Sequence, residues 1–314
     1  MKFASVFCVA AAVLASTASA REAGPELVEP GRLSTPMHES GGSFTADGQQ
    51  VVYALRTGPY YRSTIVIGTR RGRTWSFEAA PFSGGADYDV DPFILANGRA
   101  IYFSSNRSPA GGAAKADFDI WRSFRTPSGW TEPQLVQDIN SPANETSPVV
   151  SESGVLYFAS RRTGRGDIYT AEPVEDGFAS PQPIGDAVNS PAPETSVTID
   201  PKEQVLVFSA SSRADELLVE GTPYGRGDLY VSYRGASGWS PARRLDRPIN
   251  TEAAETNPAF SPDGRWLFFT SERSYALDTT RPLSHAQLKA RLQKPQNGLG
   301  DLYRVPTQEL EQKR

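Results

Sequence analysis

Five acidic residues recur at matching positions along the chain, each directly before a segment with strand character. They are Glu39, Asp89, Glu145, Glu194 and Glu255. If the repeats surround an axis, these carboxylates meet at the mouth of a central channel, where like charges raise one another's pKa or bind a cation. Oxygen ligands suit a hard ion such as Ca²⁺ or Mg²⁺. The pattern allows a divalent cation in the channel, or a pair of carboxylates placed for glycoside hydrolysis.

A structural role for these acids is the competing hypothesis, because each repeat also supplies an arginine and four repeats supply a further aspartate. A hydrogen-bonded Glu–Arg–Asp set in every repeat would join strands and neutralise its own charge. The residues expected in this repeated network are Arg107, Asp119, Arg161, Asp167, Arg213, Asp228, Arg273 and Asp301.

Residues that break the repeat are better candidates for an individual function. His38 stands beside Glu39, where other repeats have Asn144, Pro193 or Ala254. The chain has two histidines, His38 and His285, which excludes a His-rich zinc site. Exposed aromatic side chains next to polar ones suit sugar rings or peptide segments. The aromatic candidates for such a binding rim are Tyr60, Tyr61, Tyr224 and Tyr275.

The elements that must position these residues are short strands in five repeats, which start near residues 39, 89, 145, 194 and 255. Asp47-Gly48 and Asn97-Gly98 mark tight turns after the first strand of their repeats. The second strand is apolar and aromatic, as in Trp266–Phe269. Four strands at this period are typical of a propeller blade. We expect an all-β, five-bladed β-propeller of four-stranded blades.

The two ends of the chain complement each other. The last repeat lacks its fourth strand, and the segment Glu29–Pro36 near Leu33 resembles the fourth strand of an internal repeat, such as Glu132–Leu135. An N-terminal strand should therefore complete the last blade, and closure of this kind hides strand edges. Extra residues lie between the second and third strands, at 108–116, 214–226 and 274–299. Insertions on one face of a repeat ring mark its working face, and Ser284–Lys294 predicts a short helix there.

Several copies of one motif carry a family resemblance. Phe260–Gly264, Leu267–Arg273 and Gly300–Tyr303 resemble the WD40-like (PD40) repeat of the TolB-type β-propeller family. The resemblance covers nearly all of the chain after residue 20. It implies a periplasmic or secreted propeller that binds proteins, peptides or glycans, and some relatives carry enzymatic domains or sites.

The N-terminus has the pattern of a secretory signal peptide. Met1-Lys2 is followed by an apolar run and by Ala18-Ser-Ala20, so we expect cleavage near Ala20 and a periplasmic or secreted protein. The propeller domain should then span 21–310, with a polar tail at 311–314. The net charge is −4, and about −5 without Lys2, which gives no reason to expect nucleic acid as a partner. No other stretch is long enough to span a membrane, and we expect a monomer.

Two functions remain open from the sequence. The first is a binding module that recognises an envelope or extracellular protein, peptide or glycan at the inserted-loop face. The alternative is a carbohydrate-active hydrolase or lyase that uses the channel-mouth carboxylates. The chain contains no Gly-x-Ser-x-Gly, His-Glu-x-x-His or phosphate-loop motif, so the binding module is favoured and no cofactor is expected.

Overall fold

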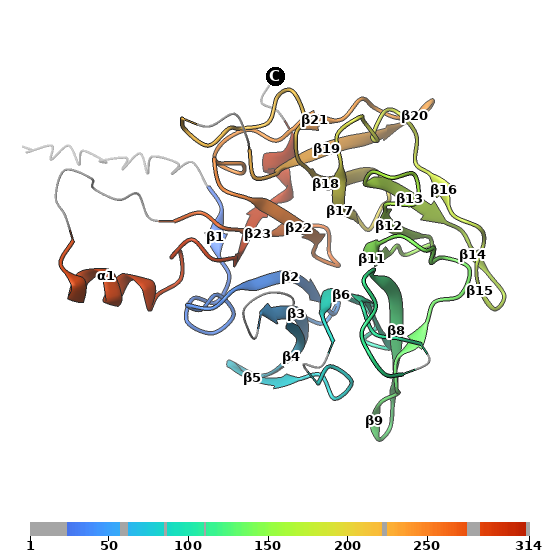
Figure 1. The fold of residues 1–314 in the computed structure, drawn as a ribbon, viewed down its shortest axis with the longest axis horizontal. Helices are drawn as coiled ribbons and strands as arrows, with labels where there is room; N and C mark the ends of the chain where they lie inside the picture. The colour runs from blue at the N-terminus through green and yellow to red at the C-terminus, as the bar shows by residue number, and fades with distance from the viewer. Residues whose placement is uncertain are drawn as a thin grey trace, which may run out of the picture.

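Five antiparallel sheets surround a central axis in the computed structural model, which describes residues 24–56, 62–84, 87–109, 111–221, 225–274 and 283–311 (Figure 1). The predicted signal peptide and most of the polar tail lie outside this range. The chain is a five-bladed β-propeller. The prediction of an all-β propeller with four-stranded blades is therefore confirmed.

Each blade runs outward from an innermost strand at the axis. Blade 1 consists of β2 (Glu39–Phe44), β3 (Gln50–Arg56), β4 (Ser63–Arg71) and β5 (Thr74–Ala79). Blade 2 consists of β6 (Asp89–Ile94), β7 (Ala100–Ser105), β8 (Asp119–Thr126) and β10 (Gln134–Leu135). Blade 3 consists of β11 (Glu145–Val150), β12 (Leu156–Ser160), β13 (Asp167–Ala171) and β16 (Gln182–Pro183). Blade 4 consists of β17 (Glu194–Ile199), β18 (Val205–Ala210), β19 (Asp228–Gly235) and β21 (Arg243–Arg244). Blade 5 consists of β22 (Glu255–Phe260), β23 (Trp266–Ser271), β24 (Asp301–Pro306) and β1 (Glu26–Leu27).

Short hairpin extensions and two helices complete the described part of the chain. The extensions are β9 (Gly129–Trp130), β14 (Pro173–Val174), β15 (Gly177–Phe178) and β20 (Gly238–Trp239). The helices are α1 (His285–Leu292) and the 3₁₀ helix η1 (Thr307–Leu310). No helix in the described ranges is long and apolar enough to cross a membrane.

The blades form because the second and third strands are apolar on both faces and are covered by the neighbouring blades. Leu206 and Phe208 of β18, for example, pack with Tyr157 and Ile168 of blade 3, and all four are buried. The predicted turns follow β2 and β6, where Gly48 and Gly98 have φ of 64° and 70°. These left-handed conformations are the reason for glycine at both places.

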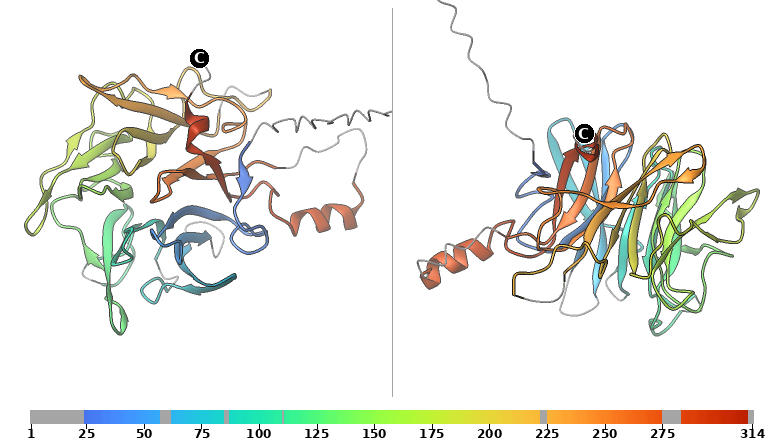
Figure 2. Two further views of the ribbon diagram at one scale, coloured as in Figure 1. Left: turned by 180° about the vertical axis from the view of Figure 1, so that it is seen from behind. Right: turned by 90° about the horizontal axis from the view of Figure 1, so that it is seen from above.

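The N-terminal strand closes the ring by pairing with β24, so β1 lies in the same blade as the last strand of the chain (Figure 2). The strand is Glu26–Leu27. The sequence analysis predicted it near Leu33, which is six residues further along the chain. Leu33 is fully buried, and it precedes Glu39 by the same six residues that separate Ile139 from Glu145. The predicted closure by an N-terminal strand is confirmed, and the predicted position of that strand near Leu33 is wrong.

Candidate functional site

The five repeated acids begin the innermost strands, but they do not form an open rim. All five are buried, with at most 1% of their surface exposed. In four of them, the residue four positions earlier donates through both its backbone N–H and its hydroxyl. Ser141, for example, donates to Glu145 over 2.7 Å from each group. Asp89 instead accepts from Ser83 Oγ at 2.6 Å. The hydrogen-bonding capacity of these carboxylates is largely used inside their own blades.

An arginine completes the set in four blades. Its Nη2 lies close to the carboxylate in the pairs Arg107–Asp89 (2.8 Å), Arg162–Glu145 (3.5 Å), Arg213–Glu194 (2.6 Å) and Arg273–Glu255 (3.3 Å). The same nitrogen also donates to a backbone carbonyl in the segment that leads from the preceding blade. For Arg162 this carbonyl is Ile139 O, between blades 2 and 3. Each guanidinium lies over aromatic rings of its own blade, which adds a cation–π contact. This set holds the blade together.

Two details of the predicted network differ from the structure. In blade 3 the partner is Arg162 and not Arg161, because Arg162 stands two residues after Ser160 just as Arg273 follows Ser271. The second detail concerns the four aspartates of the third strands, for which no contact with these arginines is found in the described residues. Their partners are Lys115 for Asp119, Arg165 and Thr163 for Asp167, the Leu217 N–H and Arg244 for Asp228, and the Gln296 N–H for Asp301.

Blade 1 differs, because the arginine of its repeat, Arg56, forms no ion pair with Glu39 among the described residues. Leu55 lies opposite Glu39, where three other blades place a serine, and no described lysine or arginine forms an ion pair with Glu39. Its carboxylate is held by the Thr35 hydroxyl and backbone N–H. Burial, with a smaller contribution from the nearby Asp301 carboxylate, raises the pKa of Glu39 to about 7. Burial also raises the pKa of Asp301 to about 6. Two weakly compensated carboxyl groups therefore meet at the junction of blades 1 and 5.

His38 belongs to the same junction. Its Nδ1 accepts a hydrogen bond from the Gly300 N–H at 3.1 Å. Burial, followed by the positive charge of Arg56, lowers the pKa of His38 to about 4. The neutral imidazole therefore accepts a hydrogen bond from the backbone of blade 5. This structural role at the junction of blades 1 and 5 explains the histidine, and no bound ligand is needed.

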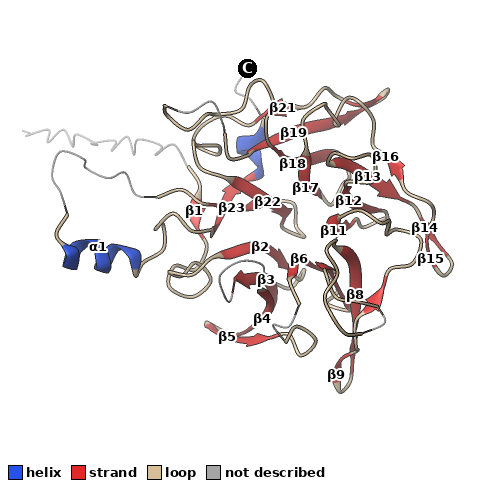
Figure 3. Ribbon diagram, viewed as in Figure 1, coloured by secondary structure: helices blue, strands red, loops and turns tan. Residues whose placement is uncertain are grey.

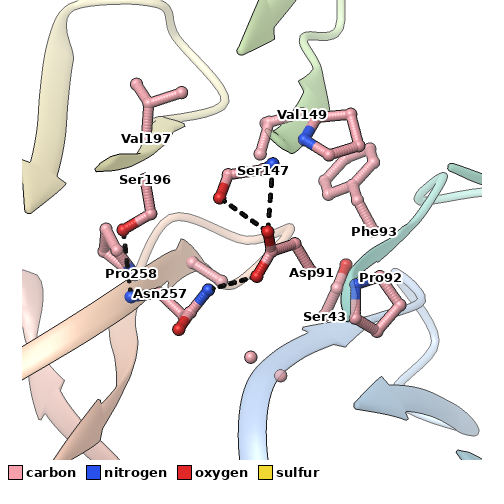
Figure 4. A pocket seen from close by; sticks show the side chains of 14 residues that line it. Ser43, Asp91, Pro92, Phe93, Ser147, Val149, Ser196, Val197, Asn257 and Pro258 are labelled. Atoms are coloured by element: carbon pink, nitrogen blue, oxygen red, sulfur yellow. Dashed lines mark hydrogen bonds between the residues drawn. The ribbon is translucent and has the colours of Figure 1, made fainter. Parts of the chain in front are cut away.

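The side chains that face the central channel lie two residues after each acid, at a position where the repeats differ. They are Gly41, Asp91, Ser147, Ser196 and Asn257, and they line a cavity of about 30 Å³ (Figure 4). In all five blades the strand register shifts directly after the acid, and in four of them a left-handed residue follows, which is Gly41, Asp91, Ser147 or Asn257. Bulges re-aim side chains in this way, and Gly, Asp and Asn tolerate the conformation best.

Asp91 is the charged member of this ring, and it joins three blades. Its Oδ2 accepts from the backbone N–H and the hydroxyl of Ser147 at 3.2 and 3.1 Å, and from Ser104 Oγ at 3.5 Å. Its Oδ1 accepts from Asn257 Nδ2 at 2.7 Å (Figure 4). Burial raises the pKa of Asp91. Sequence reasoning missed this residue, although the variation two positions after each acid was a usable signal.

A larger cavity of about 500 Å³ adjoins the ring and opens among the turns between the first and second strands. We call this side the turn face; it is opposite the inserted-loop face. The wall of the cavity includes Phe44, Phe93, Val149, Ile199 and Phe260, and Glu152 and Asp200 stand among its polar residues. A volume of this size is typical of small-molecule sites. Ser43, Phe93 and Val149 line both cavities, so the two are direct neighbours along the channel.

Comparisons with known proteins were made at three levels. No protein-family model matches the chain, and no curated protein matches it. Among solved structures, a putative TolB from Agrobacterium tumefaciens is 18% identical, with a TM-score of 0.40 over 73% of this chain and 88% of the other. The catalytic domain of a GH62 α-L-arabinofuranosidase from Coprinopsis cinerea is 13% identical, with a TM-score of 0.45 over 90% of this chain and 94% of the other.

The Kuenenia stuttgartiensis hydrazine synthase is also similar, at 12% identity and a TM-score of 0.48 over 84% of this chain and 40% of the other. These neighbours range from a TolB-like propeller to enzymes of different chemistry. Their likeness is too low to transfer an activity.

The inserted-loop face carries α1, which lies away from the blades in every view (Figures 1–3). A capping box begins the helix, since Ser284 Oγ accepts from the Gln287 N–H and the Gln287 side chain accepts from the Ser284 N–H. None of its side chains is buried. The four tyrosines Tyr60, Tyr61, Tyr224 and Tyr275 lie outside the described residues, so their place in a binding rim stays a prediction.

A metal site finds no support in the part of the chain that the structure describes. No group of three or more His, Cys, Asp or Glu side chains is placed there to hold an ion. The five repeated acids have separate partners in separate blades.

Proposed function

We propose that this chain is an exported β-propeller that acts as a binding module and holds a protein partner at its inserted-loop face. The observation that carries the proposal is α1, a capped helix that buries none of its side chains. Leu288 and Leu292 are 44% and 53% exposed, and they lie one turn apart on the same side of the helix. Leu283, just before the cap, is 40% exposed.

A helix of this length needs outside support. Helices below about 12 residues are marginal in water, and most helical stability in proteins comes from packing of an apolar face. The capping box starts α1, but none of its side chains is buried against the described part of the propeller. An apolar groove on a partner would supply that packing, in the way that grooves accept amphipathic helices.

The charge around α1 indicates the chemistry of the partner. Residues 283–294 contain Lys289, Arg291 and Lys294 and no acidic residue, although the whole chain is acidic. A groove edged with carboxylates is therefore complementary, and binding should weaken as salt screens these charges. The proposed partner is an envelope or extracellular protein with an apolar groove and an acidic edge.

The enzymatic alternative is less well supported. Glycoside hydrolysis needs two carboxyl groups that reach the scissile bond. The five repeated acids are buried, and serine, threonine and arginine side chains occupy their oxygens. A sugar could reach them only if the blades opened.

A pull-down with matched helix variants tests the proposal. The mature protein is used to retain partners from envelope extract, beside Leu288→Ser/Leu292→Ser and the control Ala286→Ser/Ala290→Ser on the opposite side of α1. Neither pair changes the charge, and neither site is buried, so all three proteins should unfold at the same urea concentration. We expect the wild type and the control to retain the same partner and the leucine variant to lose it.

Two outcomes would overturn the proposal. One is retention of the same partner by the leucine variant. The other is binding of α1 to anionic lipid vesicles with no protein retained, because a basic helix with exposed leucines also suits a membrane surface. With the isolated partner, hydrogen exchange across 284–293 should slow on binding in the wild type and not in the leucine variant.

A further inference from the structure

The central channel contains the Asp91 carboxylate and an apolar cavity. Neither belongs to the acid–arginine set that recurs from blade to blade. The small cavity at Asp91 measures about 30 Å³, which is room enough for a water molecule or an ammonium group. The cavity of about 500 Å³ adjoins it on the turn face. Together they offer a narrow polar end and a wide apolar body.

The charges along this path have one sign. Asp91 lies at the narrow end, and Glu152 and Asp200 lie on the wide one. No lysine or arginine is among the described residues that line either cavity. No ion pair to Asp91 occurs in the described residues, so hydrogen-bond donors alone compensate its carboxylate.

Asp91 has room for a further donor. Three hydrogen bonds, from Ser147 and Ser104, reach Oδ2, whereas Oδ1 accepts from Asn257 alone among the described residues. A carboxylate has about four lone-pair positions. Figure 4 shows Asn257 on one side of the carboxylate and Ser147 on another. Phe93 and Val149 line both the small cavity and the wide one. A further donor in the small cavity would find its free acceptor position on Oδ1.

We propose that the channel binds an organic ammonium ion, with its nitrogen beside Asp91 and its apolar body against Phe44, Phe93 and Phe260 in the wide cavity. An ammonium head would add a positive charge and a further donor to the neutral donors that hold Asp91, and aromatic walls favour both the apolar body and the positive charge beside it. A bare divalent ion fits less well, because it requires six or more oxygen ligands and this chamber supplies one carboxylate. An anionic ligand would meet three carboxylates and no base.

This site does not depend on the proposed function. It lies on the turn face, opposite α1, and it would bind a small molecule rather than a protein groove. Loss of partner binding in the α1 variants would leave it intact.

Titration calorimetry with defined probes tests the inference. The probes are 2-phenylethylammonium and n-hexylammonium, with 2-phenylethanol as the neutral match, and K⁺ and Ca²⁺ alone. We expect the ammonium probes to bind the wild type at least about tenfold more tightly than the alcohol, because a charge-assisted hydrogen bond replaces a neutral one. Asp91→Asn should remove that preference, and asparagine also tolerates the left-handed backbone at this position.

A second variant keeps the test informative if Asp91→Asn does not fold. Glu152 is exposed at the wide end, and Glu152→Lys should weaken the ammonium probes by about twofold to fivefold through charge alone. The control is Glu175→Lys, an equally exposed residue between β14 and β15, which should have no effect. Equal binding of ammonium and alcohol overturns the inference. So does binding of the metal ions alone, no binding of any probe, or equal effects of Glu152→Lys and Glu175→Lys.

Discussion

Leu27 lies directly opposite Tyr303 in blade 5, so the first described strand of the chain completes the blade that contains the last. The backbone continues this contact, because the Val28 N–H donates to Leu302 O at 2.9 Å. Ser34 Oγ then donates to the same carbonyl at 3.0 Å. Three residues near the N-terminus thus hold one edge of β24.

Removal of β1 should destabilise the whole propeller. A chain that starts at Pro30 loses the pairing of Glu26 and Leu27 with β24 and the buried side chain of Val28. We expect a loss of roughly 3 kcal/mol or more in the free energy of unfolding, from the apolar burial of Leu27 and Val28. Urea unfolding of this chain, beside one that starts at Gly24, measures the loss. Equal stability of the two would mean that the ring does not need β1.

Neighbouring arginines offer a matched test of the blade network. Arg162→Met leaves buried Glu145 and the Ile139 carbonyl without their cation, and breaking a buried pair of this kind costs about 3–5 kcal/mol. Arg161 is exposed, and Arg161→Met should change stability by less than about 0.5 kcal/mol. Denaturant unfolding of both variants gives the comparison. Similar losses for the two would show that Arg162 has no special role.

The sequence predicted the blades well because the repeated segments determine them. The acid, the apolar second strand and the third-strand Asp-Ile/Leu-Tyr/Trp element recur together, and each recurrence became one blade. The register of the closing strand was harder to predict. Glu29–Pro36 resembles Glu132–Leu135 in its letters, but the distance from Leu33 to Glu39 matches the distance from Ile139 to Glu145. Spacing to the next acid was the better guide.

The candidate sites were less predictable, for a geometrical reason. The acids looked available for chemistry because sequence does not reveal which hydroxyls will surround them. Asp91 follows Asp89 by two residues, so strict alternation would place both side chains on one face of the strand. The bulge after Val90 redirects Asp91 into the channel. Strand alternation does not reveal the bulge, although the variation two positions after each acid marks the residue that it redirects.

Glu39 should make the stability depend on pH. Its pKa rises from 4.5 to about 7 on folding, so between these values the folded state binds more protons than the unfolded state. Stability from this group is complete below about pH 4.5 and falls as pH rises through 7. Asp301 acts in the same direction up to about pH 6, whereas His38, whose pKa falls to about 4, acts in the opposite direction below 6.5. Burial also raises the pKa of Asp228 to about 7, so the decline that remains between pH 6.5 and 8 should come from Glu39 and Asp228 together.

Glu39→Gln isolates this effect. The glutamine cannot ionise, so the variant should lose less stability than the wild type between pH 6.5 and 8. Urea unfolding at four pH values measures both slopes, with the exposed Glu175→Gln as the control. A wild-type slope that Glu39→Gln does not change would assign the pH dependence to other groups.

Weakening the cap of α1 should separate local from global stability. Ser284→Ala removes the hydroxyl that accepts from the Gln287 N–H, and loss of such a cap costs a helix about 1 kcal/mol. Hydrogen exchange across 285–292 should therefore be about fivefold faster. The urea midpoint should not move, because α1 buries no side chain against the propeller. Ala286→Ser, inside the same helix but outside the cap, is the control. A lower midpoint for Ser284→Ala would show that α1 supports the blades, and its exposed leucines would then need another explanation than a partner.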